Sequence, residues 1–302
     1  MLSVHQARRG LGVFLVSLVT LTFGSIWIFR RLPSFHFTDI GYYLVMMTCL
    51  SYSPALASLI ARVCLREGVR DVSFRLGEWG WSAMVIGWLW PVVCGGVVFG
   101  GAWALGIARF QWTSAGYPYG SWGPETLLGL SIYRHSAATG LVVRLFACLL
   151  FAFVGCIQSF GEEVGWRGYM LTRLFDARLP APIFWNGLVW GLWHIPFYVI
   201  LASPPHPPEP YAVSRFFFVT GTIALAYLMG YLRLRSGSIW PSVLAHASMN
   251  SVLVLGFPAF TVANGFLKGE LYLATLGLPM AALLLWRRPW IMQYWPQAGA
   301  SS

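Results

Sequence analysis

Long apolar runs alternate with short polar segments along this chain, and the pattern predicts its secondary structure. Several runs reach about 18 residues, the length that an α-helix needs to cross a bilayer. Together the candidate spans are residues 11–29, 39–63, 81–107, 137–161, 184–201, 213–232, 239–257 and 271–286. The sequence therefore predicts an all-α, polytopic membrane helix bundle of about eight transmembrane helices. We expect a single integral-membrane domain over residues 1–302, with a disordered tail at 297–302.

The composition supports a membrane protein. Only 10% of the residues are charged and 57% are hydrophobic, whereas a soluble domain carries about 25% charged residues. The net charge of +10 would suit nucleic acid, but the basic residues flank the apolar runs instead of forming one patch. We therefore exclude nucleic acid as a partner. The five cysteines are scattered without CxxC spacing, so neither a disulfide framework nor a cysteine zinc cluster is expected.

The basic residues also predict an orientation. If the N-terminus is cytoplasmic, the connections assigned to the inner side hold most of the Lys and Arg residues, as topology signals do. The pair Arg30 and Arg31 is the one awkward exception. Of the 20 basic residues only Lys268 is a lysine, a bias associated with bacteria. We expect a bacterial cytoplasmic (inner) membrane protein with both termini in the cytoplasm.

Two adjacent carboxylates stand at the end of the fourth apolar run, in the segment GEEVGWR at residues 161–167. A carboxylate at membrane depth costs roughly 2.5–3.5 kcal/mol on insertion scales, so such residues normally face the bundle interior with a partner. On a helix, Glu163 and Arg167 share a face, which predicts an ion pair between them. Glu162 is rotated by about 100° from Glu163 and is left available for chemistry.

Two histidines lie well inside predicted spans. His194 follows Trp190 by four residues in WGLWH, and His246 precedes Asn250 by four in HASMN. Residues four apart on a helix project from the same face. Histidines on two helices beside a buried glutamate pair favour catalysis over simple packing. From the predicted topology, we expect the active site inside the bundle, in the inner half of the bilayer.

These motifs carry a resemblance to a known family. EExxxR at 162–167, an aromatic-xxx-His at 190–194 and HxxxN at 246–250 occur in the order found in the CPBP family. This family comprises type II CAAX prenyl protease-like intramembrane endopeptidases together with bacteriocin-processing and Abi-type proteins. The resemblance covers residues 137–257, the predicted catalytic core. One departure is Trp190, where the family usually carries phenylalanine.

The resemblance implies a set of roles for the motif residues. Glu162 and His194 would activate a water molecule, and His246 and Asn250 would stabilise the oxyanion of the tetrahedral intermediate. Side-chain donors aimed at a developing oxyanion are worth about 2.7–4 kcal/mol each in other proteases. Glu163 and Arg167 are expected to support this arrangement. The implied substrate is a membrane-anchored or lipidated peptide, cleaved by a glutamate-type endopeptidase.

A metal-dependent mechanism is the alternative within the same family, whose members have also been described as metalloproteases. His194 and His246 together with Glu162, or with Glu163 in its place, would supply a zinc set of two histidines and one glutamate, with one open position. Against this, the sequence has no HExxH motif, and an asparagine is a poor zinc ligand. The interpretation therefore favours a site without a cofactor.

Two other functions are open from the residues alone. In a proton- or cation-coupled transporter, the same glutamates and histidines would relay protons or bind a cation. Such a protein would show inverted repeats and paired broken helices, and the sequence shows neither. The other alternative is a catalytically silent member of the bacteriocin-immunity type. The sequence favours the endopeptidase.

Overall fold

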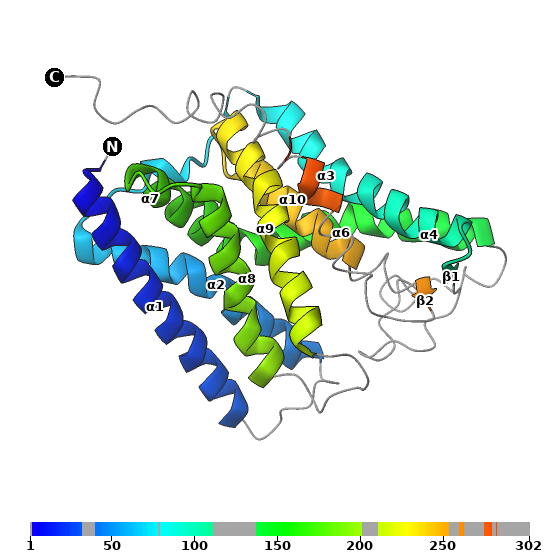
Figure 1. The fold of residues 1–302 in the computed structure, drawn as a ribbon, viewed down its shortest axis with the longest axis horizontal. Helices are drawn as coiled ribbons and strands as arrows, with labels where there is room; N and C mark the ends of the chain where they lie inside the picture. Colours follow the sequence, from blue (N-terminus) through cyan, green and yellow to red (C-terminus); the bar gives the residue numbers. More distant parts are fainter. Residues whose placement is uncertain are drawn as a thin grey trace.

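The computed structural model of the protein consists almost wholly of helices (Figure 1). It describes residues 2–31, 40–77, 79–110, 137–200, 211–253, 260–262, 275–279 and 282. The long helices are α1 (Val4–Arg31), α2 (Ile40–Leu65), α3 (Gly80–Gly95), α6 (Ala137–Gly165), α8 (Pro182–Ile200), α9 (Tyr211–Ser236) and α10 (Trp240–Ser251). Short helical segments are η1 (Arg70–Val72), η2 (Gly96–Gly100), α4 (Gly101–Ala104), η4 (Trp166–Met170) and α7 (Leu171–Asp176). The predicted all-α class is confirmed across these ranges, apart from one antiparallel pair of three-residue strands, β1 (Ala108–Phe110) and β2 (Phe260–Val262).

Four of the described helical stretches are long and apolar enough to cross a membrane: Val4–Arg31, Met47–Leu65, Gly80–Ala104 and Leu145–Asp176. Large apolar side chains on them are exposed, including Phe23 and Trp27 on α1 and Phe153 and Ile157 on α6. A soluble protein rarely exposes so much apolar surface, so these faces suit lipid. The protein is integral to the membrane. Eight crossings stay a prediction, because most of the run 271–286 and the whole tail 297–302 lie outside the described residues.

Helix α6 lies at the centre of the packing. It contacts α2 on one side and α10 on another, while α10 also packs on α3, and α8 packs on α9 (Figure 1). Gly161 explains the close approach of α2, because a Cβ at this position would lie 2.7 Å from the Tyr52 ring and 2.8 Å from the Ser51 carbonyl oxygen. A small residue is therefore needed one position before the glutamate pair.

A tight turn between α9 and α10 sets the direction of the helix that carries His246. Helix α9 ends at Ser236, and Gly237 follows with a φ of 65°, a left-handed conformation that glycine adopts without strain. Helix α10 then starts with Pro241 in its first turn, where a missing backbone N–H costs nothing. The chain reverses over a few residues, and His246 lies inside the bundle, 2% exposed.

Candidate active site

The glutamate pair lies within a continuous helical stretch and not at its end. The predicted span closes at residue 161, but α6 continues to Gly165 and is followed without a break by η4 and α7. Glu162 is 5% exposed and Glu163 is fully buried. The two carboxylates therefore sit in the interior, where each needs a hydrogen-bonding partner.

Glu163 holds two partners with one oxygen. Its Oε1 accepts a hydrogen bond of 2.8 Å from Arg167 Nη1 and lies 2.9 Å from Nδ1 of His246. The ion pair with Arg167, predicted from the spacing, is confirmed, whereas the contact with His246 was not predicted. With Glu163 ionised, the His246 Nδ1 carries the proton and donates it. The His246 Nε2 then accepts a hydrogen bond when the ring is neutral and donates one when the ring is protonated.

Trp190 of α8 joins the second glutamate to the same group. Its indole N–H donates a hydrogen bond of 2.9 Å to Glu162 Oε2. The Arg167 guanidinium carbon lies 4.3 Å from the centre of the Trp190 ring, and the His246 ring lies edge-on at 5.2 Å. A phenylalanine here would supply the ring surface but not the donor. The sequence marked Trp190 only as the aromatic residue of a motif, so this hydrogen bond was missed.

His194 lies one turn further along α8 and is half-buried. Its Nδ1 is 2.8 Å from the backbone carbonyl oxygen of Trp190. A carbonyl oxygen only accepts, so Nδ1 carries the proton and Nε2 is the basic nitrogen of the neutral ring. The charges of Glu162 and His246 both act on the His194 ring. The imidazole is therefore within electrostatic range of the candidate base and of the second histidine.

Asn250 is the remaining motif residue, four residues after His246 on α10 and half-buried. No hydrogen bond joins its amide to another side chain or carbonyl in the described part of the chain. The fold thus brings Glu162, Glu163, Arg167, His194 and His246 into one connected group, with Asn250 a turn away from His246. Their catalytic roles stay predictions.

Several buried polar atoms of this group lack a partner within the part of the chain that the structure describes. Among those residues, nothing bonds to Oε2 of Glu163 or to Nε and Nη2 of Arg167, although both side chains are fully buried. Buried polar atoms in proteins are normally hydrogen-bonded, to protein or to ordered water. The unmatched atoms belong to the same two side chains that contact Trp190 and His246.

The metal alternative needs one of the two glutamates together with His194 and His246 around one ion. Over the ranges that the structure describes, no three His, Cys, Asp or Glu side chains are close enough together to hold a metal. The His246 Nδ1 is directed to Glu163. The side chains as placed do not form the proposed zinc set.

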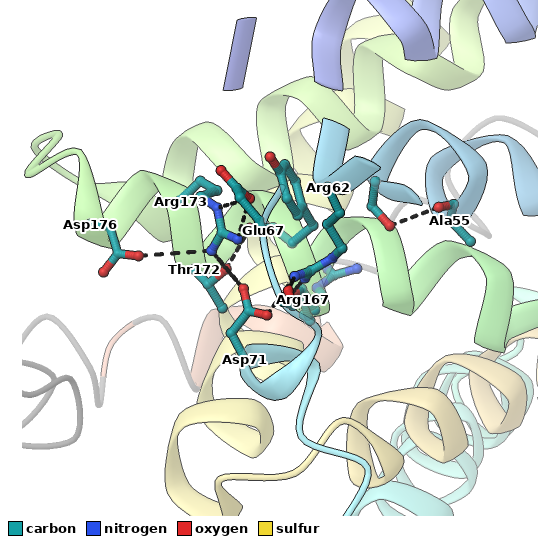
Figure 2. Close-up of polar contacts among 12 residues, drawn as sticks. Ala55, Arg62, Glu67, Asp71, Arg167, Thr172, Arg173 and Asp176 are labelled. Carbon is teal, nitrogen blue, oxygen red and sulfur yellow. Dashed lines mark hydrogen bonds and ion pairs between the residues drawn. The ribbon is translucent and has the colours of Figure 1, made fainter. Parts of the chain in front are cut away.

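A second polar group lies outside the motifs, where α7 meets the connection between α2 and α3 (Figure 2). We call Arg62, Glu67, Asp71, Arg173 and Asp176 the charge cluster. Arg173 Nη2 lies 2.6 Å from Glu67 Oε2 and its Nη1 2.6 Å from Asp71 Oδ2, and Arg62 Nη1 lies 2.7 Å from Asp71 Oδ1. One signal for this cluster was present in the sequence, since REGVRD at 66–71 puts two acidic residues in a connection otherwise rich in arginine.

The charge cluster sets the ionisation of Asp71. Burial alone would raise the pKa of Asp71, but the hydrogen bond from Arg62 and the positive charges of Arg173 and Arg62 outweigh it. The pKa therefore lies below its ordinary value of 3.8.

Comparison with known protein families agrees with the motifs. Residues 144–252 match the family described as type II CAAX prenyl endopeptidase Rce1-like. The matched segment contains EExxxR, the aromatic-xxx-His and HxxxN. Residues 144–252 are thus similar to a CAAX protease family, the same family that the motifs resemble. It matches no curated protein.

Proposed function

We propose that the protein is an intramembrane endopeptidase that hydrolyses peptide bonds of a membrane-anchored or lipidated peptide. The observation that carries this proposal is the connected, buried group formed by Glu162, Glu163 and His246 with Trp190, with His194 in electrostatic range. Three separate helical stretches supply these residues, and the segment that contains them matches a protease family.

Water activation is assigned to Glu162 and His194. A water molecule held between the Glu162 carboxylate and the basic Nε2 of His194 gives up a proton as its oxygen attacks the carbonyl carbon of the scissile bond. The same proton then passes to the leaving amine as the carbon–nitrogen bond breaks, so no net proton is consumed. General acid–base help of this kind contributes typically about 10²–10⁴-fold to a rate.

Oxyanion stabilisation is assigned to His246 and Asn250. The protonated His246 ring donates from Nε2 to the developing oxyanion, while its Nδ1–H donates a hydrogen bond to Glu163. The Glu163 carboxylate accepts the hydrogen bond from Nδ1 of the ring, and Arg167 fixes the carboxylate. The Asn250 amide, one turn along α10, supplies the second donor. Neither step uses a metal.

The cellular setting is part of the proposal. The protein crosses a bacterial cytoplasmic membrane about eight times, with both termini in the cytoplasm and the residues 137–257 as its catalytic core. The substrate carries an apolar anchor, because a site enclosed by apolar helices is reached from the bilayer.

The test is cleavage of a panel of quenched, lipid-tailed peptides by purified protein in proteoliposomes, with and without chelator. We expect cleavage that survives metal removal and is abolished by His194→Ala. Loss of cleavage with recovery on added zinc would instead assign a metal to the site. If the wild-type protein cleaves no peptide but moves protons or cations across the vesicle, the endopeptidase proposal is wrong. It is equally wrong if the protein neither cleaves peptides nor moves ions.

A further inference from the structure

Three consecutive carbonyl groups of η4 accept hydrogen bonds from side chains of three other helices. Asn186 Nδ2 of α8 donates to the Trp166 oxygen at 3.0 Å. Arg233 Nε of α9 donates to the Arg167 oxygen at 3.4 Å, and Arg62 Nη2 of α2 donates to the Gly168 oxygen at 3.2 Å. The segment that carries Arg167 is therefore held from three directions.

The backbone of η4 has an unusual helix geometry, and the three hydrogen bonds stabilise it. η4 is a π-helix, in which the N–H of Leu171 reaches back five residues to the Trp166 carbonyl. Such π-turns are rare, are less favourable than an α-turn and occur frequently at functional sites. External donors to three successive carbonyls compensate for this unusual turn, because each carbonyl oxygen can accept two hydrogen bonds.

Two of the three donors are themselves fixed at a second point. Arg62 also bonds to Asp71 of the charge cluster, and this pair is drawn in Figure 2. Arg233 Nη2 donates to the Asp71 backbone carbonyl at 2.6 Å. Asn186 is 1% exposed, so packing fixes its side chain. The carbonyls of η4 are thereby tied to the charge cluster through two arginines.

Arg167 couples the position of η4 to the positions of the candidate catalytic groups. Its Nη1 holds Glu163, which in turn holds His246. Its guanidinium also stacks on Trp190, whose indole N–H holds Glu162. A shift of η4 therefore moves both halves of the site, and misplacement by about 1 Å costs up to roughly 10²-fold in rate.

We propose that Arg62, Asn186 and Arg233 are positioning residues that act through Arg167. They touch neither the substrate nor the reacting water, and they fix the π-helical backbone from which Arg167 reaches Glu163 and Trp190. This inference rests on the proposed endopeptidase function for its kinetic readout, while its structural part is tested without activity.

The first variant is Asn186→Leu, which keeps the volume of the side chain and removes the donor to Trp166. We expect kcat to fall by roughly 10–100-fold with KM unchanged. Faster hydrogen–deuterium exchange is expected in the peptide that covers η4. The matched control is Tyr52→Phe, which removes a 2.8 Å hydrogen bond from α2 to the Ile157 carbonyl of α6 but does not reach η4. It should leave both readouts unchanged.

A double-mutant cycle separates positioning from general destabilisation. If Asn186 acts through Arg167, then Asn186→Leu lowers kcat in the wild-type chain and adds little in an Arg167→Gln chain. Equal fold losses in both backgrounds would show that the residue supports only the fold, and would overturn the proposal. If Asn186→Leu does not fold, Arg233→Lys replaces it, since lysine keeps the charge but lacks the Nε donor.

Exchange measurements keep the two proposals distinct. If Asn186→Leu speeds hydrogen–deuterium exchange of η4 while the wild-type protein cleaves no peptide, the positioning role holds and the endopeptidase proposal is rejected. If Asn186→Leu changes neither the exchange of η4 nor kcat, the positioning role is rejected and the endopeptidase proposal stands.

Discussion

The candidate active site and the charge cluster both pair arginine with acidic residues in largely buried positions, but they use their arginines differently. In the charge cluster, Arg173 donates from all three of its nitrogens, to Glu67, Asp71 and Thr172. In the site, Arg167 donates through Nη1 alone, and its Nε and Nη2 bond to no described residue.

We interpret the difference as one between an arginine that stabilises the fold and an arginine that supports the proposed chemistry. A buried arginine whose donors are matched holds its neighbours in place, whereas unmatched donors lower stability by about 1–3 kcal/mol per group. Natural proteins retain such local costs where function requires them. The two regions are also joined, because Arg62 and Arg233 each contact both η4 and Asp71.

The largest expected effect comes from replacing a glutamate by glutamine in the candidate active site and, for comparison, in the charge cluster. Glu162→Gln removes the candidate base and should lower kcat by about 10²–10⁴-fold with little loss of thermal stability. Glu67→Gln weakens the bonds from Arg173 and should lower the unfolding temperature, with much less effect on kcat in the folded fraction. Steady-state cleavage and thermal unfolding in the same detergent compare them. A fully active Glu162→Gln chain would contradict the assignment of the base.

A substitution of Arg173 should show that the charge cluster stabilises the fold. Arg173→Met removes the ion-pair partner of Glu67 and leaves Asp71 paired with Arg62 alone, and breaking a buried ion pair in this way costs roughly 3–5 kcal/mol. Thermal or denaturant unfolding of the purified protein measures the loss. A change of less than about 1 kcal/mol would mean that these contacts behave like an exposed ion pair.

Asn250→Ala tests the side-chain amide that bonds to no described residue. If the amide stabilises the oxyanion, kcat should fall by about 10²–10³-fold while stability changes little. Asn250→Asp is the matched control, because it keeps the size of the side chain but removes the N–H donors. Full activity of either variant would remove Asn250 from the oxyanion site.

Trp190→Phe isolates one hydrogen bond. The ring under Arg167 is kept and the donor to Glu162 is lost, so we expect a smaller fall in kcat, of roughly 10-fold, as for loss of one hydrogen bond to a charged group. Unchanged kinetics would show that the ring surface alone matters. Trp193→Phe is the comparison, since its indole donates to Thr22 and not to a glutamate.

The smallest effect is the pH dependence of the charge cluster. The folded-state pKa of Asp71 lies below its ordinary value of 3.8, so its contribution to stability is complete above that pH. The contribution is lost as the pH falls through the lowered pKa. The unfolding temperature between about pH 5 and pH 2 should therefore fall more steeply for the wild type than for Asp71→Asn. Parallel curves would remove Asp71 from the acid response.

The sequence alone determined the helical class, the membrane setting and the pairing of Glu163 with Arg167, because apolar period and helical spacing are local properties of the chain. It also marked His194, His246 and Asn250 through short motifs. Local spacing does not determine which helices become neighbours. The contact between Glu163 and His246, which are 83 residues apart, could therefore not be predicted from the sequence.

Only the tertiary structure decided how these groups are connected. Packing of α8 and α10 around η4 placed the Trp190 donor on Glu162 and the guanidinium of Arg167 over the Trp190 ring. The apolar span predicted to close at residue 161 is part of a longer helical stretch, since α6 continues to Gly165 and runs on into η4 and α7. Contacts between distant segments depend on packing and charge pairing in space, which the order of residues does not contain.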